Sequence, residues 1–576
     1  MSDLVTLFGT DQPPVVGQRF AAGPWALTLE DGAVRHITLN GREAIRNIAF
    51  LVRDRDWGTL VPVISNLDVV AADGGLRVTY DADFTSGAAT LAVRVSIEVS
   101  ADRLVMTATG TAQGAFETNR AGFTVLHPIA DVAGQPVRVD HSDGSCEDSV
   151  FPDHIAPWQP FMEISALTHQ VGDAALRCAL EGDRFEMEDQ RQWGDASFKT
   201  YNRPLALPWP YRIEDGACLS QAVELTWNPR PAPAREERAQ GRSDATFPEM
   251  ALVIDADDAR RLGRHPGDVA GVGPQRLLCH FDATLGDTAR QFSAFAAAQK
   301  ACPGQLFDLE LICGFEGEPD AELHSLAREM RAAGFEPDSV LVCPSVDRQS
   351  TPPGSDWPPC PPLPDIHAAA AGAFGGMTRG GGMVSFFPEL NRKRPPVALL
   401  DFVSHGLCPI VHAADDVSVM ETLQAVPHIT RSARAIIGDA EYRIGPATLA
   451  MRQNPYGTRT IPNPDRARIC MADDDPRHRG RFGAAYAIGL ACALAPAGIS
   501  VWTPAALYGP RGVVGADGAW PISSALRGLA ALAGARVHHA QITEGVAEAR
   551  IGDTRVTANL GAEPSGTLEA YGWAID

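Results

Sequence analysis

Two patterns of hydrophobic and polar residues divide the chain. Between residues 20 and 230, short stretches alternate apolar and polar residues, as in LAVRVSIEVSADRLVMTATG (91–110). Turn signals such as Asp31-Gly32 and Asn40-Gly41 separate them. A period of two predicts half-buried β-strands, and these dipeptides are typical of tight turns between strands. Because helical periodicity is nearly absent, this part is predicted to form an antiparallel β-sandwich.

The pattern changes after residue 248, where apolar runs alternate with helical segments. The predicted strands are RLLCHFD (276–282), LFDLELIC (306–313), SVLVCPSV (339–346), MVSFFPELN (383–391), ALLDFVSHG (398–406), YRIGPATLAM (442–451) and ISVWTP (499–504). Among the helices, 319–334 has Pro319 in its first turn and Gly334 at its C-terminal end. Alternating strands and helices predict a (β/α)8 TIM-type barrel. PIVHA (409–413) is the candidate for the eighth strand, although it follows the preceding strand too closely for a normal parallel crossover.

These patterns predict a multidomain protein of the α/β plus all-β class. We expect an N-terminal β-sandwich domain over 1–245, a catalytic TIM barrel over 246–515 and a short C-terminal β region over 516–576. The stretch 227–248 is rich in proline, charge and small residues, as in a linker. A β pattern returns from about residue 536, but this part is too short for an independent domain.

Composition narrows the class of protein. A formal net charge of −22 argues against nucleic acid or an anionic membrane as the main partner. The first residues, MSDLVTLFGT, lack a basic segment followed by an apolar one, so no signal peptide is expected. The eleven cysteines form no CxxC motif and no zinc-type cluster. We therefore expect a cytoplasmic enzyme with no nucleic-acid or membrane partner, and the oligomeric state stays open.

Polar residues at the carboxyl ends of the predicted strands are the candidates for chemistry, because barrels of this class carry their sites there. The predicted catalytic residues are Glu389, Glu310 and Asp282. The predicted substrate-binding residues near them are His280, Asn391, His405, His412, Asp415 and Arg452. Glu389 is the strongest candidate, since it follows an apolar run and precedes a basic cluster. Each residue taken singly could instead be a structural ion pair or a helix cap.

A second group of polar and aromatic residues lies in the β domain, in FEMEDQRQWGDASFKTY (185–201). Trp193, Lys199 and Tyr201 are its candidates for substrate binding. Two interpretations explain this segment equally well. It is either an exposed charged hairpin or a loop that reaches over the barrel mouth to contact a sugar.

Several common catalytic motifs are absent from the sequence. It has no Walker loop, no GxSxG elbow, no HExxH and no GxGxxG between a strand and a helix. A serine-hydrolase or nucleotide mechanism therefore has no support, and no cofactor or metal is expected. Whether a metal bridges His280, Asp282, His412 and Asp415 stays open at this point.

Four long stretches resemble the bacterial D-apionate lactonase family. They are FEMEDQRQWGDASFKTYNRPL, FFPELNRKRP, CPIVHAADDVSVMETL and YRIGPATLAMRQNPYG. The resemblance implies an N-terminal domain, a TIM barrel and a short C-terminal domain, and hydrolysis of the small-molecule sugar lactone D-apionolactone to D-apionate. Ring opening needs a base, donors for the oxyanion and an acid. Glu389 would be base or acid with Glu310 or Asp282 as its counterpart, and Asn391, His405 and Arg452 would be the donors.

Two other classes of function remain possible on the sequence alone. A barrel glycoside hydrolase would use two carboxylates at a defined separation. Such enzymes usually have Asn directly before the acid/base Glu, whereas Pro388 precedes Glu389, and YRIGPATLAMRQNP offers no second Glu. A non-catalytic carbohydrate-binding protein would present aromatic platforms without a carboxylate pair, and the several acidic strand ends weigh against it.

Overall fold

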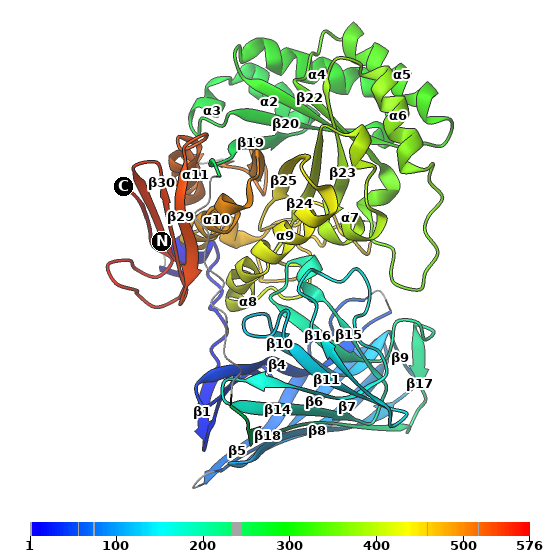
Figure 1. The fold of residues 1–576 in the computed structure, drawn as a ribbon, viewed down its shortest axis with the longest axis vertical. Helices are drawn as coiled ribbons and strands as arrows, with labels where there is room; N and C mark the ends of the chain where they lie inside the picture. Colours follow the sequence, from blue (N-terminus) through cyan, green and yellow to red (C-terminus); the bar gives the residue numbers. More distant parts are fainter. Residues whose placement is uncertain (1–2, 56, 73–74, 232–244, 458, 516–517) are drawn as a thin grey trace.

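The computed structural model describes residues 3–55, 57–72, 75–231, 245–457, 459–515 and 518–576. A large antiparallel sheet domain lies below a parallel barrel, and a small sheet lies beside the barrel (Figure 1). Residues 232–244 of the predicted linker lie outside the described residues. Among the described residues, no helix is both long and apolar enough to cross a membrane.

The N-terminal domain is built from one 16-stranded antiparallel sheet that follows the order β1-β2-β3-β4-β10-β16-β15-β13-β14-β18-β8-β7-β6-β5, with β11 paired to β13 and β12 paired to β11. Its strands are β1 (Gln18–Ala22), β2 (Trp25–Glu30), β3 (Ala33–Leu39), β4 (Arg42–Arg53), β5 (Val63–Ala72), β6 (Gly75–Ser86), β7 (Ala89–Val99), β8 (Arg103–Gln113), β10 (Arg120–Pro128), β11 (Pro136–His141), β12 (Cys146–Val150), β13 (Ile164–Val171), β14 (Ala174–Glu181), β15 (Phe185–Glu188), β16 (Ser197–Asn202) and β18 (Cys218–Pro229). A two-stranded ladder pairs β9 (Phe116–Thr118) with β17 (Tyr211–Ile213).

This sheet folds over a shared apolar core. Its strands alternate buried and more exposed residues, as the period-two pattern predicts. Phe50 of β4 packs against Phe123 of the neighbouring β10 and against Phe84 of β6, at ring-centroid distances of 5.6 and 6.1 Å. Since β4 and β6 lie far apart in the strand order, the sheet must curl until its two halves face each other. The predicted β-sandwich is confirmed.

The second domain is a closed barrel of eight parallel strands. They are β19 (Glu249–Ile254), β20 (Arg276–Asp282), β21 (Leu306–Cys313), β22 (Ser339–Pro344), β23 (Thr378–Phe386), β24 (Phe402–Leu407), β25 (Glu441–Ala447) and β26 (Val501–Ala506). The TIM-type barrel is confirmed, but the eighth-strand candidate at 409–413 is wrong. Those residues form turns after β24, and EMALVI (249–254) is the missing strand, which pairs with both β20 and β26.

Helices cover the outside of the barrel, with α4 to α6 at the top of Figure 1 and α8 and α9 at the boundary with the sheet domain. They are α2 (Ala256–Arg264), α3 (Gly267–Ala270), α4 (Thr288–Ala301), α5 (Pro319–Ala332), α6 (Leu363–Ala373), α7 (Phe387–Lys393), α8 (Asp416–Glu421), α9 (Val426–Ile437), α10 (Arg481–Leu494) and α11 (Pro521–Ala530). The helix predicted from Pro319 is confirmed. The strand predicted over 383–391 ends at Phe386, so Glu389 lies in α7, where Pro388 suits the first turn.

The C-terminal residues form a four-stranded antiparallel sheet of β29 (Val537–Thr543), β30 (Val546–Ile551), β31 (Thr554–Asn559) and β32 (Trp573–Ile575). This sheet packs against α10. The N-terminal helix α1 (Asp3–Phe8) lies at the same place, where the Phe8 ring contacts those of Phe482 and Tyr571. Both ends of the chain are therefore anchored on the barrel.

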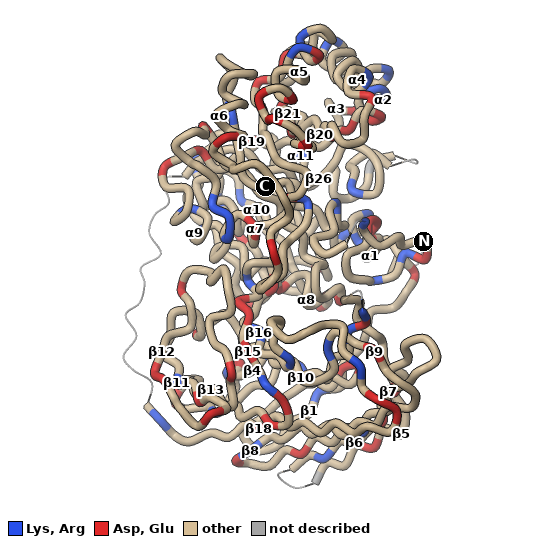
Figure 2. The backbone as a smooth tube through the Cα atoms, turned by 90° about the vertical axis from the view of Figure 1, so that its right-hand side faces the viewer, with Lys and Arg blue, Asp and Glu red and all other residues tan. Residues whose placement is uncertain are grey.

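Polar contacts join the two large domains. Arg35 of β3 donates to Asp415 at 2.9 Å and to Ser418 at 3.0 Å, across the boundary with α8. Asn391 of α7 donates to the carbonyl oxygen of Ile155 at 3.0 Å. Figure 2 shows acidic and basic positions interspersed over both domains, so the net charge of −22 is spread over the molecule. The sheet domain therefore covers the side of the barrel mouth that carries α7 and α8.

Candidate active site

The mouth of the barrel carries a network of charged side chains, which we call the barrel-mouth cluster: His280, Asp282, Glu310, Arg348 and Arg452. Nδ1 of His280 lies 2.6 Å from Oε1 of Glu310. Arg452 binds the same carboxylate with both terminal nitrogens, Nη1 to Oε1 at 2.5 Å and Nη2 to Oε2 at 3.2 Å. Four of the five residues were predicted from strand ends, and the structure brings them together.

The barrel itself positions this cluster. His280 and Glu310 are register partners on the neighbouring strands β20 and β21, so their side chains meet on one face. An irregularity in β23 between Gly382 and Phe386 interrupts its ladder with β24 and leaves the Val384 carbonyl to accept from Arg452 at 2.6 Å. Gly382 has a φ of +123°, and a Cβ there would lie 2.0 Å from a backbone oxygen of β24. Only glycine fits this close approach.

Burial and charge decide the protonation of Glu310. Burial by itself raises the pKa of this carboxyl, but the charge of Arg452 and the hydrogen bond from His280 outweigh it and lower the pKa to about 2. Glu310 is therefore ionised near neutral pH and cannot serve as a general acid there. The His280 side chain remains 26% exposed, against 1% for Glu310. The imidazole is thus held by an ionised carboxylate and still reaches solvent.

Asp282 ends β20, and both of its carboxylate oxygens accept hydrogen bonds. One oxygen accepts from the backbone and hydroxyl of Thr284, at 2.9 and 2.6 Å, and caps the short helix η2 (Ala283–Leu285). The other accepts from Nη1 of Arg348 at 2.6 Å. Arg348 was not among the predicted residues because it follows β22 in a short helix, η3 (Ser345–Arg348), beyond the strand end.

Glu389 lies in a second, more buried group. Its Oε1 accepts from Ser350 Oγ at 2.5 Å and from the Thr351 backbone and Arg392 at 3.2 Å each. Both Glu389 and Arg392 have side chains that are 2% exposed. Burial raises the pKa of the neighbouring Asp347. The charge of Lys393 opposes this increase, and the charge of Glu389 adds to it. Glu389 therefore holds the loop after β22 against α7.

The segment 185–201 borders the barrel mouth and is not an exposed hairpin. Its residues are largely buried in β15, the short helix η1 (Gln190–Trp193) and β16, and η1 packs against α7. Oδ2 of Asp195 lies 2.7 Å from Nδ1 of His412 and accepts its hydrogen bond. The Trp193 ring lies 5.9 Å from His412 and 5.2 Å from Tyr456, between ring centroids. The rings of Trp193, His412 and Tyr456 thus form a contiguous group between the domains.

Other residues predicted to bind substrate instead form hydrogen bonds or ion pairs with neighbouring side chains of the protein. His405 is fully buried, with Nε2 2.7 Å from the hydroxyl of Tyr442, and burial lowers its pKa to about 4. Tyr201 donates to Glu186 at 2.6 Å, and Lys199 forms an ion pair with Glu188 at 2.6 Å. Together with Asn391 and Asp415 at the domain boundary, these residues lie outside the barrel-mouth cluster.

Three residues next to these groups were missed: Asp347, Asp195 and Tyr456. Asp347 lies three residues beyond the end of β22 and directly follows the strand predicted over 339–346, so the strand-end rule could have selected it. Tyr456 follows Arg452 in a loop with no strand or helix of its own. Asp195 pairs with a residue 217 positions away, and no local pattern indicates such a pairing.

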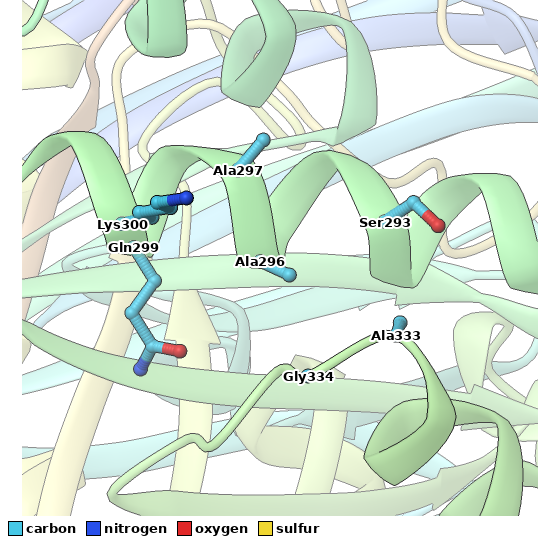
Figure 3. Close-up of a pocket in the computed structure, with 7 residues that line it drawn as sticks. All are labelled: Ser293, Ala296, Ala297, Gln299, Lys300, Ala333 and Gly334. Carbon is cyan, nitrogen blue, oxygen red and sulfur yellow. The ribbon is translucent and has the colours of Figure 1, made fainter.

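A cavity of about 350 Å³ lies between the domains, and its lining includes Arg53, Lys199, Asp195 and His412. A second groove, of about 480 Å³, lies on the outside of the barrel, between α4 and the loop after α5 (Figure 3). It is lined by small residues, Gln299 and Lys300, and by no carboxylate or histidine. It therefore offers no acid–base chemistry. Among the described residues, no three His, Cys, Asp or Glu side chains are grouped as metal ligands.

A closed parallel barrel that gathers histidine, carboxylates and arginines at its C-terminal end defines an enzyme of the TIM-barrel class. Residues 5–230 match the family model of the D-apionate lactonase N-terminal domain, and residues 250–534 match that of the D-apionate lactonase TIM barrel domain. A D-apionate lactonase from Brucella anthropi is 44% identical over 555 residues, which are 92% of this chain and 90% of that protein. The chain belongs to the D-apionate lactonase family. It is a hydrolase that acts on a lactone ester in sugar catabolism.

The solved structures that match this chain do so only at low identity and low TM-score. A putative aldose 1-epimerase from Escherichia coli K12 is 11% identical, with a TM-score of 0.25, and covers 37% of this chain and 99% of its own. A GH30 endoxylanase from Clostridium papyrosolvens is 10% identical, with a TM-score of 0.35, and covers 56% of this chain and 83% of its own. At these scores neither protein bears on the chemistry.

Proposed function

We propose that the enzyme hydrolyses D-apionolactone to D-apionate at the barrel-mouth cluster. The observation that carries the proposal is the His280 imidazole, held at Nδ1 by the ionised Glu310 and still 26% exposed. A carboxylate that fixes one ring nitrogen leaves the other to exchange a proton, as in other histidine bases. The substrate is taken from the Brucella anthropi relative, which is named D-apionate lactonase.

The reaction consumes one water molecule and transfers no group from the substrate to the enzyme. Nε2 of His280 accepts a proton from water while the water oxygen attacks the lactone carbonyl carbon, which forms a tetrahedral oxyanion. The oxyanion then collapses and the bond to the ring oxygen breaks. The leaving oxygen receives the proton from His280, and the product is an open-chain hydroxy acid that ionises to a carboxylate. Glu310 stays ionised throughout and stabilises the imidazolium.

Arg452 is the donor placed to stabilise the oxyanion. Its Nη1 lies 3.5 Å from Nδ1 of His280, so its guanidinium is adjacent to the base. Two bonds to Glu310 and one to the Val384 carbonyl fix its orientation before substrate arrives. Preorganised donors of this kind contribute more than donors that must reorient. Arg348, whose side chain is 28% exposed, provides a second cation for the product carboxylate.

The test is a substrate panel. Purified enzyme is given D-apionolactone, other five- and six-membered aldonolactones and aryl glycosides, and proton release or phenol release is followed against the spontaneous rate. We expect kcat/KM for D-apionolactone to exceed that for the other lactones by at least about tenfold, which one or two well-placed hydroxyl contacts provide. A higher kcat/KM for another lactone would refute the substrate. Turnover of aryl glycosides without lactone hydrolysis would refute the reaction.

A further inference from the structure

Two arginines lie directly opposite each other on the face of the N-terminal sheet that faces the barrel. Arg53 on β4 and Arg120 on β10 are register partners, and like charges in such positions repel. Lys199, on the other neighbour of β10, adds a third cation. Burial lowers the pKa of Lys199, Glu188 opposes this, and Arg120 and Arg53 lower it further. The three cations are therefore close enough to repel one another.

The carboxylates nearby do not neutralise all three cations. Glu188 is paired with Lys199 at 2.6 Å and also accepts from Trp193 at 2.8 Å. Glu186 accepts from the Tyr201 hydroxyl and the Leu205 backbone. Asp195 contacts His412, and Asp54, which accepts from the Gly58 backbone, is the carboxylate whose charge acts on Arg53.

Arg120 is left without a carboxylate. Its side chain is buried, at 7% exposure, and within the described part of the chain it forms no ion pair. Its Nε is buried without a hydrogen-bond partner. The guanidinium stacks over Tyr201, 3.9 Å from the ring centroid, and lies 5.4 Å from that of Trp57. A buried cation without an anion is costly, so this arrangement calls for an anionic ligand.

The surroundings favour an organic anion. Arg53 and Lys199 line the cavity of about 350 Å³ between the domains, where the other lining arginines, Arg35 and Arg46, are paired with carboxylates and Asp195 contacts His412. That volume is in the range of small-molecule sites. The rings of Trp57, beside Arg120, and Tyr456, beside Trp193, are partly exposed and offer apolar faces to the C–H groups of a sugar chain, whereas the Tyr201 ring is fully buried under Arg120.

We infer that Arg53, Arg120 and Lys199 bind the carboxylate of a sugar acid between the domains, at a site distinct from the barrel-mouth cluster. The choice of a sugar acid rests on the proposed function, because opening a sugar lactone produces that class of molecule. The arginines hold the carboxylate, and the aromatic side chains contact the carbon chain. The site binds product or a related aldonate and takes no part in the proton transfers at His280.

The experiment is calorimetric titration of the full-length protein with D-gluconate, with glucitol and inorganic phosphate as comparisons. Arg120→Met removes the unpaired cation, and Arg103→Met, at a 52% exposed arginine of the same sheet, is the matched control. We expect gluconate to bind at least about tenfold more tightly than glucitol or phosphate. Arg120→Met should weaken gluconate binding by about ten- to a hundredfold, as loss of hydrogen bonds to a charged group does, and Arg103→Met should leave it unchanged.

Several results would overturn the inference. They are the absence of gluconate binding, equal binding of phosphate, or an unchanged Kd for gluconate in Arg120→Met. A fall in melting temperature of Arg120→Met with gluconate binding retained would assign Arg120 to stability. If Arg120→Met does not fold, Arg53→Met takes its place with the same expectations. Titration of the His280→Gln variant separates the two proposals, since gluconate binding there should be normal whether or not His280 is the base.

Discussion

Replacing His280 with glutamine removes an imidazole base but keeps a side chain that can donate to Glu310. The hydrogen bond to be replaced is 2.6 Å long and joins a side chain that is 26% exposed to one that is 1% exposed. Glutamine has no group that accepts a proton near neutral pH. The substitution therefore tests proton transfer while it leaves the carboxylate and Arg452 paired.

The magnitude follows from the role. Loss of a positioned general base lowers kcat by about 10²–10⁴-fold, which corresponds to about 3–5 kcal/mol in the activation free energy. Stability should change little, because the partly exposed His280 contributes one hydrogen bond and glutamine can re-form it, at a net cost of about 1 kcal/mol or less. In a chain of this size that cost lowers the Tm by about 2 °C or less.

The assay is proton release from D-apionolactone, corrected for spontaneous hydrolysis, combined with thermal unfolding of the same preparations. His324→Gln is the matched control, because His324 lies on α5 with a side chain that is 45% exposed. A His280→Gln enzyme that keeps kcat within about threefold of the parent would refute the assignment of the base. A loss of activity accompanied by a large fall in Tm would show that His280 holds the fold of the mouth instead.

Three further predictions concern charged groups. Glu389→Gln leaves the buried Arg392 without a counter-charge, so it should cost about 3 kcal/mol of unfolding free energy and change kcat by less than about tenfold, measured by urea unfolding and lactone assay. Glu310→Gln should remove an acid-dependent contribution to the free energy of unfolding. The pKa of Glu310 falls from 4.5 to about 2 on folding, so the stabilisation by its charge is complete above about pH 4.5 and is lost as the pH falls toward 2. Arg35→Met and Asp415→Asn should show a coupling of about 1–3 kcal/mol in a double-mutant cycle, since Arg35 is 7% exposed and joins the domains.

Each of these predictions has a control or a result that would contradict it. A hundredfold fall in kcat for Glu389→Gln with unchanged stability would place Glu389 in the catalytic machinery. If the unfolding free energy of Glu310→Gln falls between pH 4.5 and 3 as steeply as that of the parent, another carboxylate causes the acid dependence. The pair Arg94 and Asp81, with side chains 51% and 34% exposed, is the control for the double-mutant cycle and should show a coupling below about 1 kcal/mol.

Local patterns in the sequence were enough to predict both large folds. Alternation with a period of two predicted the sandwich, and alternating strands and helices predicted the barrel, because both signals arise from which face of an element is buried. Barrels carry their active sites at the carboxyl ends of their strands. This rule selected His280, Glu310, Asp282 and Arg452 from the sequence, and the structure places them close together. The first strand, EMALVI, was missed, because it is short and follows a linker-like stretch.

The end of β23 shows where a local pattern fails. Phe386, Phe387 and Pro388 continue the apolar run of the strand, yet the chain turns into α7 at Phe387. A proline suits the first turn of a helix as well as a strand end, so the run did not specify the boundary. That change moves Glu389 from a strand end into a buried contact with Arg392 and the loop after β22.

The sequence by itself determined most of the elements, their order and the residue types at the barrel mouth. Tertiary structure alone decided which charges are neutralised. Arg53 and Arg120 meet through the pairing of β4 with β10, and His412 meets Asp195 only because the two domains dock. The physical reason is that hydrophobic periodicity is a property of neighbouring residues, whereas the pairing of buried charges depends on distances between segments far apart in the chain.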